Sequence, residues 1–113
     1  MSLQIDLHER DNDITVLTVQ GEVDMSSSSV MRGRLAPALD AGGRAVIVDL
    51  SGVTYMDSSG IATLVEGLQS SMKQGIAFRL ADLHPAVLDV FKLARLDTVF
   101  QVYDSIEDAM TDL

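Results

Sequence analysis

The stretch that decides the fold is AVIVDLSGVTYMDSSGIATLVEGLQSSMKQG, residues 45–75. It opens with a β-branched apolar run, residues 45–50, in which the first polar side chain is Asp49. Such a run is typical of a central strand that is covered on both faces. Further on, apolar residues recur at helical spacing, which predicts an amphipathic helix that ends at Gly75. The residues of this stripe are Ile61, Leu64, Val65, Leu68 and Met72.

Alternating strands and helices are predicted downstream of this stretch. Residues 77–81 and 99–103 have the composition of two further strands. Between them, Pro85 suits the first position of a helix, where its missing N–H costs nothing, and Val87, Leu88 and Phe91 would face inward. At the end, Ser105 and Asp108 resemble a capping box. They precede a final apolar stripe made of Ile106, Ala109, Met110 and Leu113.

Upstream of the stretch, a hairpin and a first helix are predicted. Residues 3–8 alternate between apolar and polar, and residues 14–19 follow them after a polar turn, which indicates a β-hairpin. We expect the chain to leave this hairpin as a loop at residues 21–24. The serines at 26–29 would cap a helix whose inner face carries Met31, Leu35, Ala38 and Leu39. Pro37 lies inside that helix and predicts a kink or an early break.

The predicted order of elements is ββαβαβαβα, an α/β fold. Strands that are separated by helices pair in parallel through right-handed crossovers, and the N-terminal hairpin adds an antiparallel element. We therefore expect a mixed β-sheet with four helices. A length of 113 residues suits one domain, to which we assign residues 1–113.

The composition disfavours several classes of protein. A net charge of −9, with the few Lys and Arg scattered, argues against direct binding of nucleic acid or of anionic membranes. The absence of Cys removes thiolate chemistry. Neither a signal peptide nor an apolar run long enough to span a bilayer is visible, so we expect a cytoplasmic protein without membrane insertion.

The segment Asp57-Ser58-Ser59-Gly60-Ile61 is the candidate site, because it joins the buried strand to the clearest helix. Free N–H groups and the helix dipole at such a position favour an anion, so they would tolerate a phosphate on Ser58. Gly60 lacks a side chain, which would let another protein approach closely. The plainer interpretation is that Asp57 or Ser58 only caps the helix.

Residues 57–61 resemble the D-S-[ST]-G-[LI] signature of the STAS family. Residues 21–24 resemble its G-E-[LIV]-D loop, residues 46–55 resemble the strand and turn that precede the signature, and residues 85–97 resemble its next helix. These four matches occur in order over nearly the whole chain. One departure is Arg95, which stands where family members often have Gly.

The resemblance implies a STAS-type fold and the role of an anti-sigma factor antagonist that is not an enzyme. In that family an anti-sigma factor that is also a serine kinase phosphorylates the serine corresponding to Ser58, and a PP2C-type phosphatase reverses this. The resemblance assigns partner contact to Asp24, Asp57, Ser58, Ser59, Gly60 and Ile61. The unphosphorylated form would capture the kinase and free a sigma factor. An alternative within the family is a scaffold subunit of a transporter or a stress-signalling assembly.

Other kinds of site find little support in the sequence. A serine hydrolase needs a base on the serine, and only His8 and His84 are available. Met56 also stands where a nucleophile elbow requires Gly. The carboxylates lack metal-ligand spacing, and Gly42-Gly43 lacks the Lys of a phosphate-binding loop. We therefore expect no metal and no cofactor.

Overall fold

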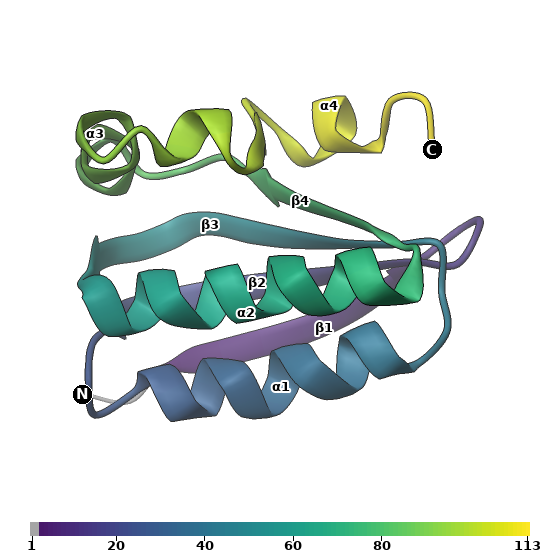
Figure 1. The fold of residues 1–113 in the computed structure, drawn as a ribbon, viewed down its shortest axis with the longest axis horizontal. Helices are drawn as coiled ribbons and strands as arrows, with labels where there is room; N and C mark the ends of the chain where they lie inside the picture. The colour runs from purple at the N-terminus through teal and green to yellow at the C-terminus, as the bar shows by residue number, and fades with distance from the viewer. Residues whose placement is uncertain (1–2) are drawn as a thin grey trace.

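The computed structural model describes residues 3–113 and contains a five-stranded sheet with four α-helices (Figure 1). The strands are β1 (Gln4–Arg10), β2 (Ile14–Val23), β3 (Ala45–Met56), β4 (Ala77–Ala81) and β5 (Gln101–Tyr103). The helices are α1 (Ser28–Asp40), α2 (Ser58–Gln74), α3 (Pro85–Leu93) and α4 (Ile106–Met110), with a 3₁₀ turn at Leu96–Thr98. The predicted order of elements and the mixed α/β fold are confirmed.

The strands follow one another across the sheet in the order β1-β2-β3-β4-β5. The β1–β2 hairpin is antiparallel, and the other three pairs are parallel, as the helices between them predict. Helices α1 and α2 lie side by side in front of the sheet in Figure 1. The carboxyl ends of β2 and β3 therefore lie at the edge where α1 and α2 begin.

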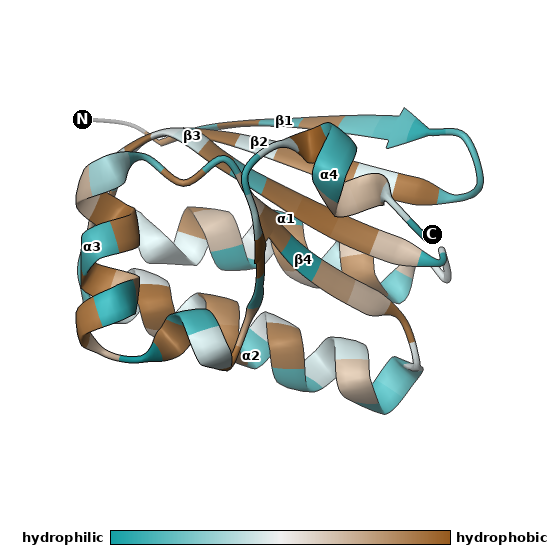
Figure 2. Cartoon of the chain, turned by 90° about the horizontal axis from the view of Figure 1, so that it is seen from above, coloured by the Kyte–Doolittle hydropathy of each residue, from teal (hydrophilic) through white to brown (hydrophobic). Residues whose placement is uncertain are grey.

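Two apolar layers hold the sheet between its helices. The larger layer lies under α1, α2 and α3, with Leu17, Val48 and Leu64 among its members. The smaller layer lies under α4 and includes Val16, Ile47 and Ala109. Figure 2 shows the matching pattern, with brown, hydrophobic residues along β3 and β4 and teal, hydrophilic residues at the end of β1. The expectation of a central strand covered on both faces is thus confirmed for β3.

Both central strands are longer than predicted. β2 continues to Val23 through two irregularities of register, so residues 21–23 are strand and not loop. β3 continues to Met56, and its pairing with β2 extends as far as Val23–Met56. The extended parallel pair brings residues 24 and 57 to neighbouring positions at one edge of the sheet.

The buried face of α2 carries small residues as well as the apolar stripe. Gly60, Thr63, Gly67 and Ser71 are buried, whereas Met72, which we expected in the stripe, is 73% exposed. A Cβ at Gly67 would lie 2.8 Å from Leu35 Cδ2 of α1. The inward face of α2 is therefore rotated away from Met72 and toward small residues, whose size lets α1 approach α2 closely. Hydropathy alone assigned Met72 to the wrong face.

Of the kink or early break expected at Pro37, the early break is wrong, because α1 runs through this residue to Asp40. Pro37 and Gly33, whose carbonyl loses its usual N–H partner, are both on the exposed face. Water can satisfy that carbonyl, which lowers the cost of the proline. Ser27 occupies the N-cap position, but its side chain makes no cap hydrogen bond to the helix. The expected capping by the side chain of this serine is therefore wrong as well.

The C-terminal part contains a strand shorter than expected. Residues 99 and 100 precede β5, and Val99 is 54% exposed. Arg95 has a φ of 59°, a left-handed conformation that favours Gly. This angle is a physical reason why a glycine suits that position. Arg79, buried in β4, donates hydrogen bonds to the carbonyls of Ala109 and Thr111 and so holds the end of α4 against the sheet.

Candidate functional site

The candidate site is formed by two loops that follow the paired ends of β2 and β3. The backbone N–H of Asp57 donates to the carbonyl of Val23 over 3.1 Å, which ties the second loop to the first. Asp24 follows Val23 directly, so the two acidic residues of the candidate site belong to adjacent loops. α2 begins here, at the left edge of the view in Figure 1. The structure thus brings together two segments that are more than thirty residues apart in the sequence.

Asp57 caps α2. Its backbone is extended, and its Oδ1 accepts from the backbone N–H of Ser59 over 2.9 Å and from the Ser59 hydroxyl over 2.5 Å. The capping role that the sequence offered for Asp57 is therefore confirmed. The same bonds fix the direction in which the first turn of α2 presents its side chains.

Asp24 holds the neighbouring loop in shape. Its carboxylate accepts from the backbone N–H groups of Ser26 and Ser27 and from both of their hydroxyls. The Ser27 hydroxyl in turn donates to the carbonyl of Glu22 over 2.7 Å. The run of serines predicted helix capping and did not indicate this network. An Asp followed by serines two and three residues later is the signal that could have indicated the turn.

The two serines of the site differ in accessibility. Ser58 is exposed and is the first residue of α2, the helix start at which the sequence predicts it. Ser59 is half-buried, and its hydroxyl is engaged by Asp57. Ser58 is therefore the more accessible hydroxyl for another protein.

Gly60 and Ile61 face the interior of the protein to a greater extent than we expected. A Cβ at Gly60 would lie 2.7 Å from both Met56 Cγ and Val23 Cγ1. The missing side chain of this buried glycine hence makes room for the protein's own strand ends, and our expectation that it makes room for a partner is corrected. Ile61 is half-buried and packs against the larger apolar layer.

Both carboxylates have depressed pKa values. The Ser59 hydroxyl lowers the pKa of Asp57 below its ordinary value of 3.8, whereas desolvation and the charge of Asp24 oppose this shift. The Ser26 hydroxyl is the largest cause of a similarly lowered pKa at Asp24. Both side chains are consequently ionised at neutral pH, and the site is negatively charged.

The depressed pKa of Asp57 predicts a pH-dependent contribution to stability. The unfolded chain binds the proton more tightly, so the contribution is present above the ordinary value of 3.8 and is lost as the pH falls through the lower folded value. We expect Asp57→Asn to be less stable than the wild type at neutral pH, with a difference that shrinks on acidification. Urea unfolding at a series of pH values measures this. A difference that stays constant into acid would contradict the prediction.

The other candidate groups lie elsewhere or have structural roles. His84 caps α3, because its Nδ1 accepts from the N–H of Ala86 over 3.2 Å. His8 is exposed on β1 beside Val16, seven residues before the end of β2. Among residues 3–113 no three His, Asp or Glu side chains form a cluster suited to a metal ion. Over the same residues, no helix has the length and hydropathy needed to cross a membrane.

Fold and site together define a mixed-sheet α/β domain that displays a serine at the start of a helix. The sequence profile of the STAS domain matches residues 4–109. The chain therefore belongs to the STAS domain family.

Its relatives in this family include anti-sigma factor antagonists. The anti-sigma-B factor antagonist of Bacillus subtilis (strain 168) is 30% identical over 102 residues, which cover 90% of this chain and 92% of that protein. The anti-sigma F factor antagonist of Paenibacillus polymyxa is 24% identical over 114 residues, or 100% of this chain and 97% of that protein. A crystal structure of an anti-sigma factor antagonist from Mycobacterium paratuberculosis has a TM-score of 0.88 at 25% identity, covering 96% of this chain and 92% of that one.

Proposed function

We propose that this protein is an anti-sigma factor antagonist, controlled by phosphorylation of Ser58. In its unphosphorylated form it binds an anti-sigma factor that is also a serine kinase, and so frees a sigma factor. Phosphorylation of Ser58 by that kinase ends the binding, and a PP2C-type phosphatase restores it. The protein itself catalyses no reaction and acts in the cytoplasm as a single domain over residues 1–113.

The observation that carries this proposal is the exposed Ser58 at the first position of α2. The loop that precedes it is held by the Asp57–Ser59 hydrogen bonds and by the Asp57–Val23 backbone bond. A hydroxyl presented on a rigid turn costs a kinase little ordering of the substrate. Asp24, in the adjacent loop, lies within the surface that such a kinase would cover.

A phosphate at this position is compatible with the fold. It adds about −1.5 to −2 charge at neutral pH. The free N–H groups of the first turn and the helix dipole favour negative charge there. The modification would accordingly change the surface of the domain and leave its interior intact.

We expect phosphorylation on Ser58 and not on Ser59. The Ser59 hydroxyl is half-buried and donates to Asp57, so phosphorylation there would break the cap of α2. The test is incubation with ATP and each anti-sigma serine kinase of the host, followed by phosphopeptide sequencing. Ser58→Ala should abolish incorporation, and Ser59→Ala should retain it. Phosphate on Ser59 with Ser58 free would reverse the assignment.

A protein that none of these kinases binds or modifies would be assigned to the scaffold function instead. A subunit that only holds a transporter or a stress-signalling assembly together has no need for an exposed serine hydroxyl. The same incubation therefore separates the two functions.

A further inference from the structure

We infer that the kinase recognises Met25 and Tyr55 as two apolar anchors beside Ser58, and that it sits over the end of the sheet. This inference rests on the proposed function and adds two residues to the binding surface. Met25 is 85% exposed and Tyr55 is 49% exposed, although both are large apolar side chains. Aromatic and Met side chains are enriched in the buried centres of protein interfaces.

The two side chains are held by the same loops and strand ends as the serine. Tyr55 is the β3 partner of Glu22 in β2 and lies two residues before Asp57. Met25 follows Asp24, whose carboxylate is bound to Ser26 and Ser27. Since these backbones are already fixed, binding has to order the two side chains but not the loops that carry them.

The directions of the two side chains determine where the partner lies. Met56 points into the layer under α1 and α2, so Tyr55, one residue before it, points to the other face of the sheet. Met25 lies in the loop that leads into α1, the helix that packs on the same face of the sheet as Met56. A partner that contacts both must cover the carboxyl ends of β2 and β3, and Ser58 lies at the same edge.

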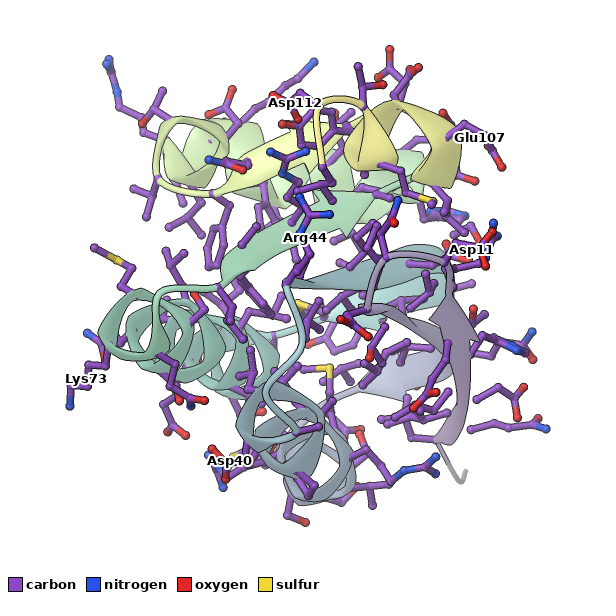
Figure 3. The ribbon with its side chains drawn as sticks, turned by 90° about the vertical axis from the view of Figure 1, so that its right-hand side faces the viewer. Asp11, Asp40, Arg44, Lys73, Glu107 and Asp112 are labelled. Atoms are coloured by element: carbon purple, nitrogen blue, oxygen red, sulfur yellow. The ribbon has the colours of Figure 1, made fainter. Side chains whose placement is uncertain are left out.

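The charge around the anchors defines the chemistry of the partner. Every charged residue in the segments 21–29 and 51–62 is acidic: Glu22, Asp24 and Asp57. The opposite end of the molecule, shown in Figure 3, carries Arg44 and Lys73 together with Asp11, Asp40, Glu107 and Asp112. A partner that complements the two anchors and their acidic neighbours therefore has an apolar hollow with a basic rim. The mixed charges at the opposite end of the molecule do not complement such a rim.

The chain supplies a matched control for each anchor. Met72 is 73% exposed near the end of α2, fourteen residues after Ser58, which is about 21 Å along a helix. Met25→Ser and Met72→Ser thus remove the same side chain from two exposed positions. Tyr55→Thr removes the ring with a residue suited to strands, and Tyr55→Phe keeps the ring.

The experiment is calorimetric titration of these variants against the host's anti-sigma kinase that phosphorylates Ser58. We expect Met25→Ser and Tyr55→Thr each to weaken binding about tenfold or more, and Met72→Ser and Tyr55→Phe to bind within about threefold of the wild type. Equal binding by all four variants would overturn the anchors and leave the proposed function standing. Failure of the wild type to bind or be phosphorylated by any host kinase would overturn both. Circular dichroism confirms that each variant is folded.

Discussion

Phosphorylated protein should bind the anti-sigma kinase at least about a hundredfold more weakly than unmodified protein. The unmodified surface already carries the ionised Asp24 and Asp57. A phosphate on Ser58 adds charge of the same sign between a partner and these groups. A partner that covers Ser58 would have to desolvate this charge and make room for the bulk of the phosphate, and both effects cost affinity.

The loss of binding should arise at the interface and not from unfolding. Ser58 is exposed, and its phosphate would stand at a helix N-terminus, which tolerates negative charge. We therefore expect circular dichroism spectra and denaturant midpoints of the two forms to be similar. A phosphoprotein that has lost its fold would show that the switch works through stability.

Substitutions of Ser58 extend the test. Ser58→Ala should bind persistently, and Ser58→Asp should bind poorly, although a carboxylate has less charge than a phosphate. Gln69→Glu is the control, because it adds a carboxylate to the exposed face of the same helix about 16 Å away. Phosphoprotein that binds as tightly as the unmodified form would eliminate the switch and favour the scaffold function.

The sequence was sufficient to predict the order of elements and the position of Ser58 at the start of a helix. Hydrophobic periodicity identified β3 and α2, and a polar turn between them put Ser58 at a helix start. Periodicity could not predict that β2 and β3 continue to Val23 and Met56, since Gly21 and Gly52 resemble loop residues. Only the tertiary pairing of the two strands stabilises these extensions.

The roles of small residues were the least predictable part of the site. Gly60 was assigned to partner approach, but its contacts with Val23 and Met56 are visible only once α2 is packed on the sheet. Ser27 was assigned to helix capping, whereas its hydroxyl is bound to Glu22 and Asp24. Both residues are compatible with several environments, and the choice among them depends on long-range packing.

Leu64→Ala should lower the free energy of unfolding by about 2–5 kcal/mol, the largest effect that we expect from a single truncation in α2. Leu64 is fully buried, at 0% exposure, in the apolar layer between the helices and the sheet. The surrounding layer is formed by strands and three helices, so it collapses only partly around the missing methyl groups. The residual cavity adds to the lost transfer free energy.

Two further truncations in the same helix calibrate this effect. Leu68 packs against the same layer but is only partly buried, so Leu68→Ala should cost less than Leu64→Ala. Met72 is mostly exposed, and Met72→Ala should change the stability by no more than about 0.5 kcal/mol. Urea unfolding of the three variants, with an unchanged dependence on denaturant, measures the series. If Leu64→Ala unfolded at the midpoint of Met72→Ala, α2 would not be anchored through Leu64, and the rigid presentation of Ser58 at its first turn would lose its physical basis.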